Sequence, residues 1–566
     1  MHEDTGRVAA VTSWGLTADT RVIEIDPPDA AAYTYLAGLG VRRYLALCRP
    51  GRARPPEIPP ERCAVLDGDR QLHANNAELL ILNGPAARHV WHRQVGVAQH
   101  VVVPATGTTS WESRLASRVR RRPRPTREQW HGRDVLVLDQ FGGPRPRSTR
   151  NYLSPVIGVG GLPARLDAQG ITYAVLRWFD RLPDMEPGED LDVLVADEHL
   201  AAFHAVLDEE PGVIPVDLYS VSGLAGSDFR SMAYYPPRLA AQLLAHCEPL
   251  PNGYRAPEPR FHFRSLAFHA LYHKGARCGV PSDLTARHAQ PEHDYTATLA
   301  ALAPADDFTG PITMESLDDH LAAVGWRPPR DTLAKLAGGD GWVTRRFFSG
   351  HAPAIEAPGL VVFLLRERAS SPAHVTGVVD TLAEHGFDVI LMKSLTVEAR
   401  QRCAEEVRGG NWGPGPFPAS GGGPAVAVVA VDPHPVAPSA ADLAQHPALT
   451  NANVLTVKQA VRDALTADVP AGEMFNPVHS SDGDADAVHY LELAVPDELD
   501  RVLAAVTELP RDRPRPVRAS PSQPVGNQRR RASGATIKAA VRRRARVLAR
   551  RGLQLVVDAR TRGGGT

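Results

Sequence analysis

The sequence predicts a multidomain protein of the α/β and α+β classes, and three observations favour this fold class. The chain has 566 residues, enough for about three or four domains. Short apolar runs alternate with stretches of helical spacing, as they do where helices cover a sheet. Hydrophobic residues make up 43% of the chain, an ordinary share for a globular protein.

Net charge, targeting signals and cysteine spacing argue against several classes of protein. A net charge of −1 gives no attraction of the whole chain to nucleic acid or membranes. The polar start Met1-His2-Glu3-Asp4 lacks the apolar segment of a signal peptide, and no apolar run approaches the roughly 18 residues that cross a membrane. The 5 cysteines show no Cys-x-x-Cys spacing, which argues against a zinc ribbon or a disulfide framework. We therefore expect a cytoplasmic protein.

The first predicted domain covers residues 1–125. Strand-like runs at 21–26, 43–48, 78–83 and 100–104 alternate with other segments, including a helical stretch at 30–37. This alternation predicts a parallel α/β sheet. The stretch resembles a degenerate Rossmann-like methyltransferase domain.

That resemblance lacks its cofactor-binding features. Pro27-Pro28 stands where a glycine-rich turn would let the backbone approach the cofactor. Cys48-Arg49 stands where an acidic residue would hold a ribose. We expect no S-adenosylmethionine binding here, and a docking or scaffold role instead.

The second predicted domain covers residues 150–345 and contains three carboxylates on strand-like runs. Asp190 and Asp192 are two residues apart in the run 188–195, so a strand places both on one face. Asp217 lies on the run 214–219, which we expect to be a neighbouring strand. Carboxylates in this arrangement can hold one or two Mg²⁺ ions, which neutralise a triphosphate.

This pattern resembles the nucleotidyltransferase superfamily of the polymerase-β type, with Gly188 and the three aspartates on its motif positions. The resemblance implies that Asp190, Asp192 and Asp217 bind metal and that Asp217 helps to deprotonate an acceptor. The family's Gly-Ser turn is replaced by Arg177-Trp178, and we expect Arg177 to grip phosphate through its charge.

A helix predicted over 263–274 follows these strands. It places His269 and His273 on one face, a spacing that can bind metal. Ala270 stands where a metalloprotease helix has its glutamate. We expect one histidine to pack in the core and the other to face an anionic substrate together with Lys274.

The third predicted domain covers residues 355–508. Strands are expected at 359–365, 387–393 and 422–431, and helices at 375–385, 456–465, 485–494 and 496–506. Between the last strand and the last helices lies Phe475-Asn476-Pro477-Val478-His479-Ser480-Ser481-Asp482, which we expect to be a short irregular stretch. Its imidazole, flanked by an amide, hydroxyls and a carboxylate, suits a phosphorylatable histidine.

The segment resembles the nucleoside diphosphate kinase signature Asn-x-x-His-x-Ser-Asp at Asn476, His479, Ser481 and Asp482. The resemblance implies a ferredoxin-like domain with His479 as nucleophile.

The domain departs from the family at the residues that grip the nucleotide. Arg366 stands for the family's lysine, and Thr456 and Lys458 stand for its Thr-x-Arg pair. Arg462 is the nearest candidate for the second arginine and lies too far upstream. The alternative is a loop histidine that only hydrogen-bonds its neighbours.

The tail covers residues 509–566. Residues 509–533 are rich in Pro, Arg, Ser and Gln and predict a flexible linker. Residues 537–557 predict a basic amphipathic helix that suits an anionic membrane surface, nucleic acid, or an acidic face of the same chain.

Together these features predict a Mg²⁺-dependent transferase that uses a nucleoside triphosphate. By family analogy the acceptor is a small molecule, such as a sugar phosphate or a surface-polymer precursor. One alternative is a non-enzymatic scaffold of degenerate domains that senses nucleotide or assembles partners. Another is a toxin-like nucleotidyltransferase that acts on RNA or protein.

Overall fold

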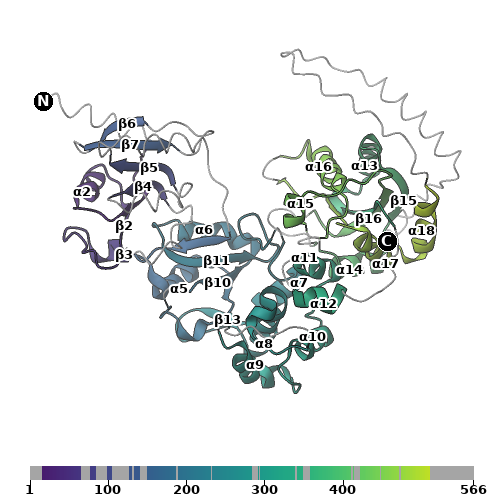
Figure 1. Ribbon diagram of the computed structural model, residues 1–566, viewed down its shortest axis with the longest axis horizontal. Helices are drawn as coiled ribbons and strands as arrows, with labels where there is room; N and C mark the ends of the chain where they lie inside the picture. The colour runs from purple at the N-terminus through teal and green to yellow at the C-terminus, as the bar shows by residue number, and fades with distance from the viewer. Residues whose placement is uncertain are drawn as a thin grey trace, which may run out of the picture. The chain divides into compact units, whose positions relative to one another are not determined.

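The protein is mixed α/β and is built from several sheets (Figure 1). The computed structural model describes residues 16–65, 77–83, 98–104, 126–130, 133–139, 149–186, 189–230, 232–283, 291, 293–337, 341–348, 357–408, 412, 421–446, 448–470 and 473–509. Contacts separate the chain into two compact units, Met1–Pro328 and Pro329–Thr566. The division falls inside the predicted domain 150–345.

The N-terminal sheet of unit 1 has seven strands in the order β3-β2-β1-β4-β5-β7-β6. The first five are parallel, as predicted, and β7 is antiparallel to both β5 and β6. The unpredicted pair β6–β7 carries the sheet past residue 125. The strands are β1 (Arg21–Ile25), β2 (Arg43–Cys48), β3 (Cys63–Val65), β4 (Ala77–Leu82), β5 (Ala98–Pro104), β6 (Thr126–Trp130) and β7 (Arg133–Asp139).

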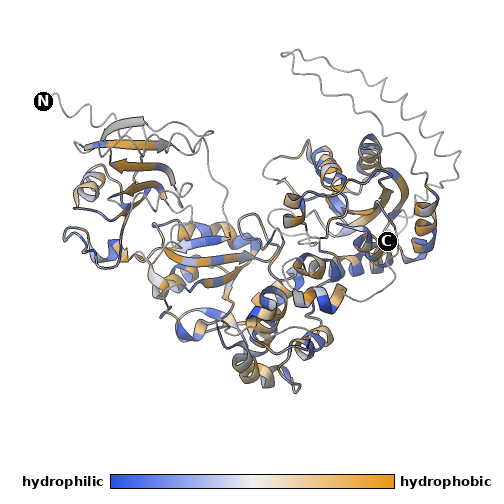
Figure 2. Ribbon diagram, viewed as in Figure 1, coloured by the Kyte–Doolittle hydropathy of each residue, from blue (hydrophilic) through white to orange (hydrophobic). Residues whose placement is uncertain are grey.

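The apolar runs of this sheet are buried because apolar residues cover both of its faces. Alternate residues of each strand point to opposite sides, so Ile23 and Val22 enter two different hydrophobic clusters. Helix α2 (Ala31–Gly38) packs Leu36 into the same cluster as Val22. The strands that Figure 2 colours by hydropathy are accordingly mainly orange.

The second sheet of unit 1 has four strands in the order β8-β11-β10-β9. The central strands β10 and β11 are parallel, and each has an antiparallel neighbour outside it. The strands are β8 (Arg150–Leu153), β9 (Tyr173–Val175), β10 (Leu191–Val195) and β11 (Ile214–Ser220). Helices α5 (Gly158–Ala168) and α6 (Leu200–Leu207) bury Leu162 and Phe203 in the same core as the strands.

The rest of unit 1 is mainly helical. Its elements are α7 (Pro237–Ala245), β12 (Cys247–Pro249), β13 (Arg255–Pro257), α8 (Pro259–Phe268), η4 (His269–Lys274), η5 (Gly275–Cys278), α9 (Tyr295–Leu302), η6 (Ala303–Asp306) and α10 (Met314–Ala323). The short 3-10 segments η1 (Pro60–Arg62), η2 (Phe179–Arg181) and η3 (Asp197–His199) lie in earlier connections.

The single regular helix predicted over 263–274 is wrong in its second half. Helix α8 ends at Phe268, and η4 continues as a π-helix from His269 to Lys274. A π-helix closes i→i+5 hydrogen bonds, and such turns are frequent at functional sites. His269, His273 and Lys274 of this π-helix all line one cavity, described below.

Unit 2 contains a four-stranded antiparallel sheet in the order β15-β16-β14-β17. Its strands are β14 (Leu360–Arg366), β15 (Asp388–Ser394), β16 (Pro424–Val431) and β17 (Val478–Ser480). Its helices are α11 (Arg330–Ala337), α12 (Gly341–Phe348), α13 (Pro372–Glu384), α14 (Val397–Glu406), α15 (Ala440–Gln445), α16 (Asn453–Thr466), α17 (Asp484–Ala494) and α18 (Leu499–Glu508), with η7 (Glu367–Ala369) and η9 (Pro496–Glu498) between them.

The continuous apolar run of strand β14 follows from burial on both of its faces. Val362 and Leu364 enter one hydrophobic cluster, while Val361 and Phe363 enter another, because the strand's two faces are both covered. The expectation of an irregular stretch around His479 is wrong, since this residue is the centre of β17, paired with Leu364 of β14.

Among the described residues no helix combines the length and apolar character that crossing a bilayer requires. All five cysteines carry free thiols. The predicted linker and basic helix at 537–557 lie outside the described residues, apart from the linker's first residue.

Candidate functional site

Three carboxylates meet at the centre of the second sheet. Asp190 directly precedes β10, Asp192 lies on β10, and Asp217 lies on β11. Parallel pairing puts Asp192 opposite Asp217, and Asp190 lies two residues from Asp192. One oxygen atom from each of the three lies within 4.8 Å of the others. The predicted spacing therefore gives a real cluster.

Two arginines pair with this cluster. Arg150, at the start of β8, places its Nη2 2.7 Å from Asp190 Oδ2 and its Nε 2.7 Å from Asp217 Oδ1. Arg177 follows β9 and places its Nη2 2.6 Å from Asp192 Oδ1. The sequence reasoning missed Arg150, although antiparallel pairing sets it directly opposite Asp217.

The other terminal nitrogen of the Arg177 guanidinium, Nη1, has no hydrogen-bond partner. The residue is only 9% exposed, and this nitrogen is buried. Such a donor is costly to leave unsatisfied. Arg177 also lines the cavity described next.

Burial and crowding make two of the carboxylates weak acids. Burial raises the pKa of Asp192 to about 6, against the lowering effect of the Arg177 charge. Burial and the negative charge of Asp192 raise the pKa of Asp217 to about 7, against the lowering effect of Arg150. Two carboxyl groups that titrate near neutrality in one cluster are typical of catalytic or metal-binding sites.

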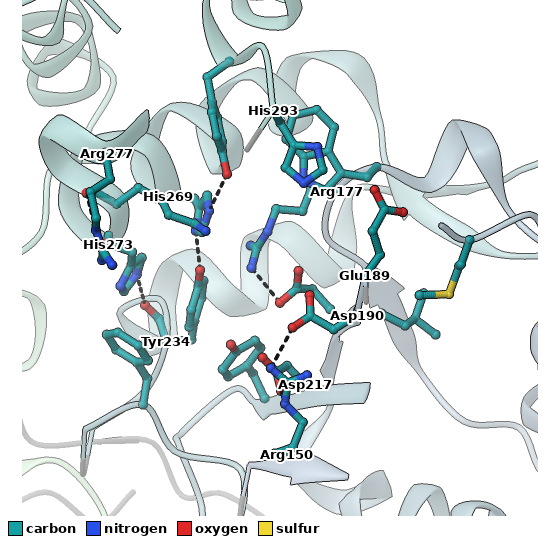
Figure 3. Close-up of a pocket in the computed structure, with 18 of the residues that line it drawn as sticks. Arg150, Arg177, Glu189, Asp190, Asp217, Tyr234, His269, His273, Arg277 and His293 are labelled. Atoms are coloured by element: carbon teal, nitrogen blue, oxygen red, sulfur yellow. Dashed lines mark hydrogen bonds and ion pairs between the residues drawn. The ribbon is translucent and has the colours of Figure 1, made fainter. Parts of the chain in front are cut away.

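The cluster opens into a cavity of about 310 Å³. Figure 3 shows the carboxylates and Arg150 at one side of it and His269, His273 and Arg277 at the other, with Arg177 between. The lining residues are Arg150, Arg177, Trp178, Leu182, Met185, Glu189, Asp190, Leu191, Asp192, Asp217, Tyr219, Phe229, Arg230, Tyr234, His269, His273, Lys274, Arg277, His293 and Tyr295. Gly188 lies outside the described residues.

The histidines of η4 form a neutral wall of this cavity. His269 is buried between two phenols, with Nδ1 2.5 Å from Tyr234 Oη and Nε2 3.1 Å from Tyr295 Oη. His273 Nε2 lies 3.0 Å from the carbonyl oxygen of Tyr234. Burial lowers the pKa of His269 well below its usual range and that of His273 to about 3. Lys274 lines the same cavity.

A second candidate centre lies in unit 2 around His479, which is 6% exposed. Its Nε2 lies 2.9 Å from Tyr490 Oη, and that hydroxyl donates to Asp331 Oδ2 at 2.8 Å. Because the phenol of Tyr490 donates its hydrogen to Asp331, its oxygen accepts a hydrogen bond from Nε2–H of His479. The tautomer that results leaves the lone pair on Nδ1.

Cations from several elements surround this imidazole. Burial lowers the pKa of His479 well below its usual range, and the charges of Lys458, Arg408, Arg462 and Arg366 lower it further. Arg366 ends β14, while Lys458 and Arg462 lie four residues apart on α16 and thus on one face. Arg462 lies too far upstream in sequence to match the family's second arginine, but α16 places its charge close enough to act on His479.

Two more charges of this centre escaped the sequence reasoning. Arg408 donates from Nη2 to Asp482 Oδ2 at 2.6 Å and from its backbone nitrogen to Asp331 Oδ2 at 2.7 Å. Burial raises the pKa of Asp482, but Arg408 and Lys458 bring it below its usual value. Asp331 lies on α11, far from the signature in sequence, so no local pattern pointed to it.

The remaining predicted residues of this centre have different surroundings. Ser481 accepts the backbone N–H of Val362 at 3.1 Å, which ties the segment after β17 to β14. Asn476 is half-buried, with an Oδ1 that has no hydrogen-bond partner. Thr456 is exposed on α16, and since it lies two residues before Lys458 it points to another side of the helix.

No protein-family model matches the chain, and no curated protein matches it either. Function is therefore inferred from the geometry of its own residues.

Proposed function

We propose that the carboxylate site of unit 1 is the active site of a Mg²⁺-dependent nucleotidyltransferase that uses a nucleoside triphosphate. The observation that carries this proposal is the cluster of Asp190, Asp192 and Asp217 within 4.8 Å. Beside it, Arg177 lines the same cavity, and its buried Nη1 has no hydrogen-bond partner. The cluster suits metal, the donor suits phosphate, and both open to the same space.

The residues fit Mg²⁺. Carboxylate oxygens are its preferred protein ligands. Burial raises the pKa values of Asp192 and Asp217, so a cation bound beside them would favour their ionised forms. Arg150 now bridges two of them, and its half-exposed side chain can withdraw. Bound Mg²⁺ would neutralise the phosphates and polarise the reacting phosphoryl group.

The chain's own residues have separable tasks. Arg177 donates from its guanidinium to a phosphate oxygen, and Lys274, which also lines the cavity, adds positive charge. The acceptor oxygen bonds to the α-phosphorus while the bond to the β-phosphate oxygen breaks, and pyrophosphate leaves. The acceptor proton goes to Asp217, whose pKa of about 7 suits a general base at neutral pH.

The strand orders support the domain folds that go with this proposal. Two central parallel strands with antiparallel neighbours that carry the three carboxylates are consistent with a nucleotidyltransferase fold. The order β3-β2-β1-β4-β5-β7-β6 is consistent with a degenerate methyltransferase-like domain. The order β15-β16-β14-β17 supports a ferredoxin-like, nucleoside diphosphate kinase-like domain in unit 2.

A second activity is favoured by one observation, the cationic surroundings of a histidine held as its Nε2–H tautomer. We propose that Nδ1 of His479 accepts a phosphoryl group. Nδ1 bonds to the γ-phosphorus while the bond to the β-phosphate oxygen breaks, and a nucleoside diphosphate leaves. Arg366, Lys458 and Arg462 supply the charge that phosphate oxygens require.

The main test incubates the protein with each α-labelled nucleoside triphosphate and Mg²⁺ and follows label into small acceptors, RNA and the protein itself. We expect transfer to a small acceptor such as a sugar phosphate; label in RNA or protein would favour the toxin-like alternative. Asp190→Asn with Asp192→Asn should weaken Mg²⁺-triphosphate binding by about 100-fold or more, because several kcal/mol of charge stabilisation are lost.

The matched control is Asp180→Asn, an exposed carboxylate outside the cavity lining, which should bind as the wild type does. Unchanged calorimetric binding by the Asp190/Asp192 double variant would refute the proposal. Triphosphate binding that needs these residues, without transfer to any acceptor, would favour the nucleotide-sensing scaffold.

A further inference from the structure

One aromatic residue of the cavity has a strained backbone. Trp178 adopts φ 56° and ψ 24°, the left-handed region, although it is not glycine. For a bulky residue this conformation costs roughly 1–2 kcal/mol, and such strain gathers at ligand-binding sites. Trp178 follows Arg177 in the chain, and both residues line the cavity.

The indole of Trp178 belongs to a small aromatic cluster. The imidazole of His293 stacks on it with ring centroids 4.1 Å apart and an angle of 24° between the planes. The ring of Tyr295 meets it edge-on, with centroids 5.4 Å apart. Trp178 is half-buried, and it lines the cavity together with His293 and Tyr295.

The order of groups along the cavity matches the order of groups in a nucleotide. The carboxylate cluster provides for metal at one side of the cavity, and Arg177, which lies between the two sides, provides for phosphate. Trp178 follows Arg177 in the chain, and its partner His293 lies above Arg177 in Figure 3, away from Asp217. A flat aromatic wall therefore adjoins the phosphate-binding donors.

We propose that Trp178, supported by His293, is the platform on which the base of the nucleoside triphosphate stacks. This inference rests on the proposed nucleotidyltransferase function. A base stacked on an aromatic side chain gains about 1–3 kcal/mol, which corresponds to about 5- to 150-fold in affinity. Stacking depends on ring area and not on hydrogen-bonding edges, so the site should accept several bases and favour purines.

The experiment compares two ligands that share the phosphates and differ in the base. Calorimetry with Mg²⁺ measures the Kd of ATP and of inorganic tripolyphosphate for the full chain. Trp178→Ala should weaken ATP binding by about 5- to 150-fold and leave tripolyphosphate binding unchanged. Phe229→Ala is the matched control, since it removes an aromatic ring from another part of the lining; it should affect the two ligands equally.

A second variant, Trp178→Phe, distinguishes loss of stacking from misfolding of Trp178→Ala. Trp178→Phe keeps an aromatic ring, so it should bind ATP within about threefold of the wild type. It removes the indole, so the quenching of tryptophan fluorescence by ATP should disappear.

The outcomes separate the two proposals. Equal weakening of both ligands by Trp178→Ala, or no weakening of ATP, overturns the stacking platform and leaves the transferase proposal intact. Retained quenching in Trp178→Phe also overturns it. Failure of the wild-type protein to bind either ligand with Mg²⁺ overturns the transferase proposal itself.

Discussion

At the scale of single residues, the two candidate centres share one physical device, the burial of ionisable groups among charges. In unit 1 it raises the pKa values of Asp192 and Asp217 to about 6 and about 7. In unit 2 it lowers the pKa of Lys458 to about 7 and keeps His479 neutral. Acids that hold protons and bases that release them near neutral pH are suited to proton and phosphoryl transfer.

The carboxylates predict a pH dependence with a definite sign. Their folded pKa values lie above the ordinary 3.8, so the folded state binds protons more tightly than the unfolded chain does. Their contribution to stability is complete below about pH 4 and is lost as pH rises through about 6 and 7. Mg²⁺ replaces those protons, so its affinity should rise about tenfold or more from pH 5.5 to 8.

The measurement is the shift of Tm by Mg²⁺ at several pH values. We expect a larger shift at pH 8 than at pH 5.5, and a flatter profile in Asp217→Asn. A Mg²⁺ shift that is independent of pH would contradict the assignment of these carboxylates as ligands.

The hydroxyl of Tyr490 predicts a coupling in unit 2. Tyr490→Phe leaves Nε2–H of His479 without its buried acceptor, at a cost of about 1–3 kcal/mol. We expect a lower free energy of unfolding in denaturant titrations and less phosphohistidine. In a cycle with His479→Ala the two substitutions should couple by about 0.5–3 kcal/mol; additive effects would show that the hydrogen bond contributes nothing.

At the scale of elements, the residues at the ends of strands determine which ligands each sheet can bind. In the N-terminal sheet, β1 is followed by Asp26, with φ 49° and no exposure. Its carboxylate accepts the backbone N–H of Arg49 at 3.0 Å and pairs with the Arg49 side chain at 2.5 Å. An ion pair thus joins the ends of β1 and β2, where a dinucleotide-type cofactor would need open backbone.

This geometry predicts that the N-terminal sheet does not bind S-adenosylmethionine. Pro27 and Pro28 provide no N–H groups at the turn, and the Asp26 carboxylate is already engaged. Equilibrium dialysis with labelled cofactor should show no saturable binding up to high micromolar concentration. As a positive control, Mg²⁺ and triphosphate should still bind the same sample; saturable micromolar binding of the cofactor would prove the prediction wrong.

At the scale of the whole molecule, the two candidate centres lie in different compact units. The hydrogen bond of His479 to Tyr490 and its ring contacts with Trp412 and Tyr490 are within unit 2, and the three carboxylates lie in unit 1. We therefore expect them to act independently. Substitutions that are well separated and share no partners usually have additive effects.

Labelling with γ-labelled triphosphate tests this independence. His479→Ala should lose an acid-labile, base-stable label, which mass spectrometry at alkaline pH detects. Asp192→Asn should keep the label, although it loses Mg²⁺-dependent binding in unit 1. Loss of label in both variants would show that the two centres work in sequence, and no label on the wild type would leave His479 a structural residue.

The sequence by itself determined the features that depend on short-range periodicity. Alternating side chains on a strand put Asp190 and Asp192 on one face, and a continuous apolar run marked β14 as a buried strand. It also located Asp217 on a neighbouring strand, because apolar runs of strand length around carboxylates are visible without a structure.

Only the tertiary structure decided what surrounds those residues. Arg150, Asp331 and Tyr490 come from separate elements, and the pairing of strands or packing of helices brings them to the carboxylates or to His479. The π-turn at His269–Lys274 and the left-handed backbone of Trp178 leave no local pattern, because neighbouring structure imposes both. Local sequence fixes which face a side chain takes, whereas burial, charge and partners depend on contacts between residues far apart in the chain.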